Sequence, residues 1–154
     1  MALETRLNST ARWPASRGRG ATETRPTASA KWLILCVDDE PDALTILRLF
    51  LCAHGFEVTV ASGVADALRL IENRRPDLVI TDYAMPGMNG LDLCRALRGP
   101  VETHDIPIIL HSGVELRTDH ADLFNRFFLK PAELDLLARE ICSLLPATPV
   151  QKSA

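Results

Sequence analysis

The 154-residue chain lacks the patterns that mark several large protein classes. No apolar run approaches the roughly 18 residues that a membrane-spanning helix needs, and the first residues lack the apolar centre of a secretory signal. Neither GxGxxG nor the P-loop motif follows any expected strand, which argues against a nucleotide-binding or flavin-binding version of an α/β fold. We therefore expect a cytoplasmic protein that does not bind membranes.

Cysteine is scarce and scattered. The four cysteines, Cys36, Cys52, Cys94 and Cys142, lie far apart and form neither a CxxC nor a Cys/His pattern. We interpret them as buried or half-buried free thiols. Free thiols fit a reducing compartment.

Charge is unevenly distributed along the chain. The formal net charge is −3, but residues 1–30 contain five arginines and only two glutamates. The remainder is acidic, so nucleic acid is not expected as a partner. Residues 1–30 also lack an apolar period and are predicted to be a disordered basic extension. Residues 31–146 should then form one domain, followed by a flexible tail over residues 147–154.

Short unbroken apolar runs occupy residues 32–37, 78–80 and 106–110. Such runs are typical of strands that are buried on both faces of a parallel sheet. Residues 56–61 and 127–129 are expected to form two further strands. The chain therefore has five candidate strands.

Helical patterns lie between these strands. Residues 42–54 should form a helix ended by Gly55, and residues 64–73 an amphipathic helix with Ser62 as its N-cap. Residues 91–98 and 134–145 should form two more, the last stopped by Pro146. Only a shortened fourth helix fits between the last two strands. The pattern predicts a doubly wound α/β fold, with a five-stranded parallel sheet and helices on both faces.

Polar residues follow four of the predicted strands. They are Asp38-Asp39-Glu40, Thr81-Asp82, His111-Ser112-Gly113 and Lys130-Pro131. Each could be a cap, a turn or a surface residue on its own, but the carboxyl ends of parallel strands meet in one crevice. Three carboxylates there need a positive charge, and oxygen-only ligands suit Mg²⁺. Asp82 could then attack phosphorus, with Lys130 and Ser112 contacting the phosphoryl group.

At this point the sequence resembles the receiver domains of bacterial response regulators, which have a flavodoxin-like fold. The motifs that carry the resemblance are Val37-Asp38-Asp39-Glu40-Pro41, Thr81-Asp82-Tyr83-Ala84-Met85-Pro86-Gly87-Met88-Asn89-Gly90, Ser112-Gly113 and Lys130-Pro131. They occur in family order over residues 32–145. The middle block is highly specific for the family.

The resemblance implies roles for residues in the acidic part of the crevice. Asp82 would be the phosphoacceptor. Asp39 would bind Mg²⁺ directly, Asp38 largely through water, and Ala84 through its backbone carbonyl.

It also implies roles for the residues that respond to phosphorylation. Ser112 and Lys130 would contact the phosphoryl group, and the peptide bond before Pro131 would be cis. Phe127, three positions before the lysine, would be the aromatic residue that follows the movement of Ser112. As a residue without a hydroxyl, Phe127 could equally be ordinary strand packing.

Three features depart from the family pattern. Ala84 stands where a polar or longer side chain often influences hydrolysis of the acyl phosphate. The connection from Ser112 to Lys130 is several residues shorter than usual. His111 is atypical before Ser112, and no partner histidine suggests a metal role for it.

The leading hypothesis is a stand-alone receiver, not an enzyme acting on an external substrate. It would take phosphate from a histidine kinase or histidine phosphotransfer protein and signal through a downstream protein. The alternative is a degenerate receiver that serves as an unphosphorylated interaction scaffold. An aspartyl-phosphate phosphatase would instead require Asp-x-Asp after the first strand, where this chain has adjacent Asp38 and Asp39.

Overall fold

Five parallel strands form a single sheet in the order β2-β1-β3-β4-β5. The computed structural model describes residues 30–116 and 118–149, so the predicted N-terminal extension lies almost entirely outside the described residues. The strands are β1 (Leu33–Val37), β2 (Glu57–Ala61), β3 (Leu78–Asp82), β4 (Ile108–Ser112) and β5 (Arg126–Leu129). The predicted strand order along the chain and the parallel sheet are confirmed.

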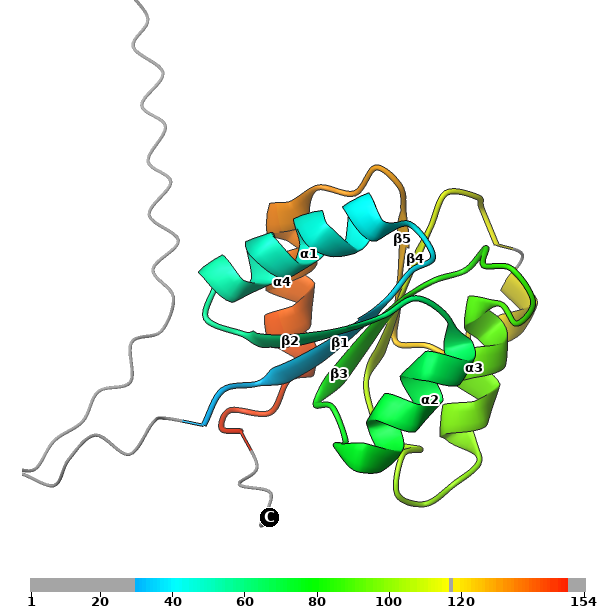
Figure 1. Cartoon of the computed structure of the whole chain (residues 1–154), viewed down its shortest axis with the longest axis horizontal. Helices are drawn as coiled ribbons and strands as arrows, with labels where there is room; N and C mark the ends of the chain where they lie inside the picture. The colour runs from blue at the N-terminus through cyan, green and yellow to red at the C-terminus, as the bar shows by residue number, and fades with distance from the viewer. Residues whose placement is uncertain (1–29, 117, 150–154) are drawn as a thin grey trace, which may run out of the picture.

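Four α-helices cover the two faces of the sheet (Figure 1). They are α1 (Pro41–Ala53), α2 (Val64–Asn73), α3 (Gly90–Arg98) and α4 (Leu134–Leu144). The helices α1 and α4 lie on one face, and α2 and α3 on the other. Each face has its own apolar cluster, because alternate residues of a strand point to opposite sides. The doubly wound α/β architecture is thus confirmed.

The periodicity of α2 explains how it packs. The buried residues of this helix are Val64, Ala67 and Ile71, as expected for an amphipathic helix. Its start differs from the prediction, because Gly63 and not Ser62 is the N-cap. Gly63 is still fully extended, with φ −178° and ψ 175°, so Ser62 lies one position too early to accept a hydrogen bond from the first turn.

A capping box that the sequence analysis missed begins α3. The Asn89 side chain accepts a hydrogen bond from the Asp92 backbone N–H at 3.1 Å, and the Asp92 carboxylate accepts one from the Asn89 N–H at 2.9 Å. The spacing Asn-x-x-Asp is a sequence signal for such a box. It fixes the direction of α3 immediately after the loop that follows β3.

The fourth helix expected between β4 and β5 is reduced to one turn of 3₁₀-helix at Thr118–His120 in the described residues. Leu123 and Phe124 pack against the cluster under α2 and α3. Asn125 links the connection before β5 to α3 and β4. Its side-chain oxygen accepts hydrogen bonds from Arg98 at 3.2 Å and from the Ile108 N–H at 2.8 Å. The predicted shortening is confirmed.

The cysteines divide into two pairs by exposure. Cys36 and Cys94 are buried as expected, but Cys52 and Cys142 are exposed, so the prediction is wrong for these two. Cys52 lies on α1 and Cys142 on α4, and both are on the solvent-facing side of the helix. The residues that pack against the sheet are at other positions of each helical turn. All four thiols are free.

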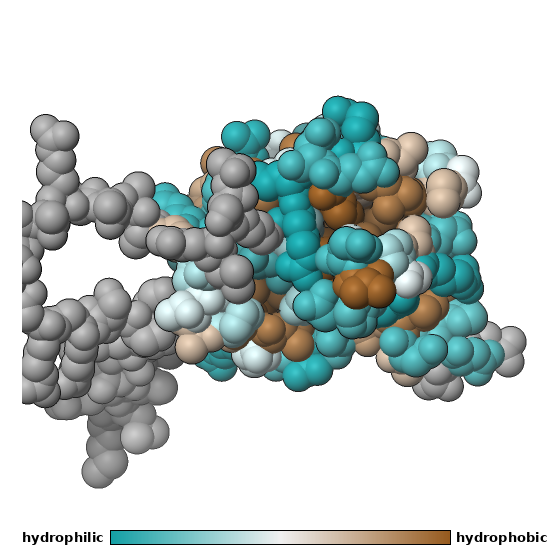
Figure 2. Space-filling view, turned by 90° about the horizontal axis from the view of Figure 1, so that it is seen from below, coloured by the Kyte–Doolittle hydropathy of each residue, from teal (hydrophilic) through white to brown (hydrophobic). Residues whose placement is uncertain are grey.

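The surface carries little continuous apolar area on the face drawn in Figure 2, where hydrophobic residues form small groups among hydrophilic ones. Within the described residues, every helix is too short or too polar to cross a membrane. The exposed large hydrophobic side chains include Ile46 and Leu49 on α1 and Leu136 on α4.

Candidate functional site

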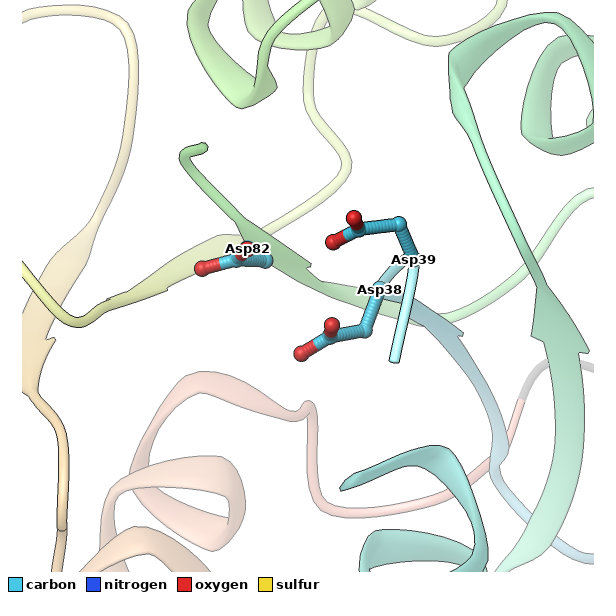
Figure 3. A group of neighbouring side chains, drawn as sticks. All are labelled: Asp38, Asp39 and Asp82. Atoms are coloured by element: carbon cyan, nitrogen blue, oxygen red, sulfur yellow. The ribbon is translucent and has the colours of Figure 1, made fainter. Parts of the chain in front are cut away.

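Three carboxylates gather where β1 and β3 end (Figure 3). Asp38 and Asp39 directly follow β1, and Asp82 is the last residue of β3. The two strands are parallel neighbours, with Val37 opposite Thr81, so their carboxyl ends lie side by side. One ligand oxygen from each carboxylate lies within 4.8 Å of the others. The sequence prediction that these residues meet in one crevice agrees with this geometry.

The three carboxylates differ in their surroundings. Asp38 is 2% exposed and Asp82 is 7% exposed, whereas Asp39 faces solvent. Asp38 is held by two contacts: one oxygen accepts a hydrogen bond from the Glu40 N–H at 2.9 Å, and the other accepts one from Lys130 at 2.7 Å. Asp39 is therefore the most accessible of the three.

Lys130 joins both sides of the crevice. Its ammonium lies 2.7 Å from Asp38 and 3.4 Å from the Asp82 carboxylate. Burial alone would lower the pKa of Lys130, but the hydrogen bond and charge of Asp38 raise it above its ordinary value. Lys130 therefore contacts two of the three carboxylates. The Lys130–Pro131 peptide bond is cis.

The charge state of Asp82 reflects opposing influences. Burial raises the pKa of this carboxyl group, the Lys130 charge lowers it, and the Asp38 charge raises it, with a net increase. One ammonium thus does not compensate fully for placing two carboxylates in a buried site. Additional positive charge would stabilise the ionised cluster.

The donor set suits a hard divalent cation. All three side chains offer oxygen, and the exposed Asp39 leaves one side of the cluster open to water. Mg²⁺ prefers oxygen ligands and retains several water molecules, so these residues fit it. His111 is not part of this ligand group.

The backbone approaches Asp82 closely at Gly90, the first residue of α3. A Cβ atom there would lie 2.1 Å from the Asp82 carbonyl oxygen. The Gly90 N–H donates a hydrogen bond to the Tyr83 carbonyl at 2.9 Å. Only glycine allows this packing of α3 against the end of β3.

The remaining predicted site residues differ in their burial. Ser112 is buried, and its hydroxyl donates to the Val114 carbonyl at 2.8 Å and accepts from the Val114 N–H at 3.1 Å. Its hydrogen bonds are therefore to its own turn. Phe127 is half-buried, with its ring 6.4 Å from that of Phe124. Ala84 is exposed in the loop after β3.

Comparison with known families gives a match to the response regulator receiver domain over residues 34–141. The chain is similar to the DNA-binding response regulator MtrA of Mycolicibacterium smegmatis, with 38% identity over 90 residues. That match covers 58% of this chain and 37% of MtrA, so the chain corresponds to little more than a third of such relatives. An uncharacterized 14.6 kDa protein of Leptolyngbya boryana is 34% identical over 73% of this chain and 92% of its own length.

Solved structures agree in fold. The response regulator TrrA of Thermotoga maritima, in complex with Mg²⁺-BeF, is 31% identical and superposes with a TM-score of 0.69. The match covers 74% of this chain and 99% of TrrA. The chemotaxis protein CheY4 of Vibrio cholerae, at 23% identity, has a TM-score of 0.70 over 75% of this chain and 100% of its own, and supports the fold alone.

Proposed function

Because the chain belongs to the response regulator receiver domain family, we propose that it is a phosphorylation switch whose acceptor is Asp82. The observation that carries this proposal is the placement of Asp82. One of its carboxylate oxygens lies within 4.8 Å of oxygens of both Asp38 and Asp39, and its Oδ1 lies 3.4 Å from the Lys130 ammonium. Anionic and cationic groups thus surround this carboxylate.

Asp82 is the best placed of the three carboxylates to act as the nucleophile. Asp38 already accepts two hydrogen bonds, and Asp39 lies exposed on the solvent side. An Asp82 oxygen attacks phosphorus, and the bond from phosphorus to the donor's histidine nitrogen breaks. The histidine nitrogen keeps the electron pair, and the acyl phosphate forms on Asp82. Asp38, Asp39, Asp82 and the Ala84 carbonyl would hold Mg²⁺, which would supply positive charge next to the phosphoryl oxygens.

The protein's own residues then hold the product and respond to it. Lys130 is within reach of the phosphoryl group, since it already lies near Asp82. Ser112 would exchange its bonds with Val114 for one to a phosphoryl oxygen, and its loop would move inward. Phe127, which is only half-buried, has the freedom to follow that movement. These steps would convert a local charge change into a new surface.

A histidine kinase or a histidine phosphotransfer protein is the proposed donor, and a further protein is the proposed target. The proposed location is the cytoplasm. The comparisons do not support the earlier exclusion of nucleic acid, because a relative is a DNA-binding response regulator. The matched part is 37% of that relative, so its DNA binding is not assigned to the segment seen here.

The test is incubation with acetyl phosphate and Mg²⁺, followed by intact mass spectrometry. We expect one phosphoryl group per chain, with no incorporation when EDTA replaces Mg²⁺. A lack of incorporation under both conditions would favour the unphosphorylated scaffold. Repeating the reaction with a phosphorylated histidine phosphotransfer protein then tests the biological donor class.

A further inference from the structure

His111 occupies a central position beside the acceptor. It lies on β4 directly opposite Asp82 of β3 and Phe128 of β5. Ile109, two residues earlier on β4, packs in the cluster under α1 and α4, as does Ile80, two residues before Asp82. Because side chains two positions apart point to the same face, His111 and Asp82 are neighbours on the α1/α4 face of the sheet.

The imidazole has one unsatisfied polar atom. Among the described residues, Nε2 of His111 is the only buried side-chain nitrogen or oxygen without a hydrogen-bond partner. Such an atom lowers the stability of a folded protein, because it has lost water without gaining a replacement. An unsatisfied group next to a reactive centre suggests a partner that arrives in another functional state.

Lys130 passes over this part of the sheet. It follows β5, yet its ammonium reaches Asp38 at the end of β1, and β3 and β4 lie between these strands. Its side chain therefore crosses the ends of the strands that carry His111 and Asp82. Burial and then the nearby Lys130 charge lower the pKa of His111 to about 4. The ring is neutral near pH 7, so one of its nitrogens can accept a hydrogen bond.

We propose that Nε2 of His111 is a second acceptor for the Lys130 ammonium, used when a phosphoryl group on Asp82 draws the lysine away from Asp38. His111 is then a positioning residue that holds Lys130 over β3 and β4, where the phosphoryl oxygens lie. This inference rests on the proposed phosphorylation of Asp82. It also accounts for a histidine whose polar atom is otherwise a disadvantage to the fold.

The direct test uses ¹⁵N NMR of the histidine side chains, with beryllofluoride and Mg²⁺ as a phosphoryl mimic. We expect the His111 Nε2 resonance to have the position of a free nitrogen in the metal-free protein and of a hydrogen-bonded nitrogen with the mimic. In Lys130→Met, the change should be absent at a mimic concentration at which ¹⁹F NMR shows the site to be filled. A hydrogen-bonded Nε2 in the metal-free protein, or a mimic-induced change in Lys130→Met as large as in wild type, would overturn the inference.

The functional test compares His111→Val with His111→Gln. Valine removes the acceptor, so phosphorylation by acetyl phosphate should slow about tenfold, which is the effect of one charged hydrogen bond. Glutamine can supply an oxygen acceptor and should restore the rate to within about threefold of wild type. Melting temperature without metal should rise in His111→Val, because the unsatisfied atom is gone.

The outcomes separate this inference from the proposed function. Wild-type protein that takes up no phosphoryl group refutes phosphorylation itself. Normal wild-type incorporation with an equal rate in His111→Val refutes only the role of His111. Equal slowing in the valine and glutamine variants also refutes it, because the shape of the ring and not its nitrogen would then matter.

Discussion

The two halves of the site are built on strands of very different burial. All five residues of β1 and all five of β3 are buried, and they carry the acidic cluster. No residue of β5 is fully buried, and this strand carries Phe127 and leads to Lys130. The proposed phosphorylation chemistry therefore lies at the ends of fully buried strands, and the proposed response involves the least buried strand of the sheet.

The difference has a structural cause. β1 and β3 lie inside the sheet with helices on both faces, while β5 is an edge strand. One face of β5 adjoins a segment in which the shortened helix that the sequence predicts is one turn of 3₁₀-helix. A few packed side chains constrain an edge strand less than a continuous helix does. We therefore expect the carboxylates that follow β1 and β3 to be held firmly in place. A shift of β5 should cost less free energy.

The largest expected effect concerns the rigid half. Asp82→Asn should abolish phosphoryl incorporation while leaving the fold intact, because the amide has nearly the same shape and is a far poorer nucleophile. Intact mass spectrometry after treatment with acetyl phosphate measures this. Asp42→Asn is the matched control, since Asp42 is an exposed residue in the first turn of α1. Full incorporation in Asp82→Asn would remove the acceptor assignment.

The second prediction compares the two halves in stability. Ile80 on β3 is 1% exposed, and Ile80→Ala should lower the free energy of unfolding by about 2–5 kcal/mol through the cavity it leaves. Leu129 at the end of β5 is 43% exposed, so Leu129→Ala should cost less than about 1 kcal/mol. Urea unfolding measures both. Similar losses would mean that the halves do not differ in packing.

The third prediction concerns the metal. Asp39→Ala should weaken Mg²⁺ binding by at least about tenfold, because a direct ligand is lost. Isothermal titration with Mg²⁺ measures the affinity. Glu40→Ala is the control, because Glu40 is also exposed and adjacent but outside the carboxylate cluster. Equal affinities in both variants would argue against the acidic site.

The smallest expected effect is a pH dependence. Burial raises the pKa of Asp82 above its ordinary value of 3.8, although Lys130 partly offsets this. The raised pKa favours the folded state fully below the unfolded pKa, and that contribution is lost as the pH rises through the folded pKa. Without metal at pH 7, Asp82→Asn should therefore melt at a higher temperature than wild type.

This difference should shrink as the pH falls toward 3.8, since protonated Asp82 no longer carries the charge. Differential scanning calorimetry at several pH values in EDTA provides the measurement. A constant difference across the pH range would assign the stabilisation to the amide itself and not to the charge. Added Mg²⁺ should reduce the advantage of the asparagine variant.

The rigid half was the easier one to predict from sequence. Its strands are unbroken apolar runs, and the carboxylates follow them directly, so their meeting needed only the rule for parallel strands. The contact of Lys130 with Asp38 was not predicted, because it depends on a side chain crossing two intervening strands. A pattern of residue types along the chain does not say how far the Lys130 side chain extends across the sheet.

Local errors have local causes. Ser62 had the right chemistry for an N-cap, but the chain remains extended for one more residue before α2 begins. Cys52 was expected to be buried or half-buried because its neighbours in the sequence are apolar. Its position in the helical turn of α1 instead faces solvent. Both depend on a displacement of one residue, which composition cannot resolve.

The contact at Gly90 limits how this site can change through mutation. Any side chain there would collide with the backbone of Asp82, so the position is closed to every other amino acid. Ala84, in the loop between β3 and α3, is exposed and can be replaced without such a collision. In the proposed switch, natural variation or directed evolution could therefore act on the lifetime of the acyl phosphate at position 84, while position 90 would remain fixed.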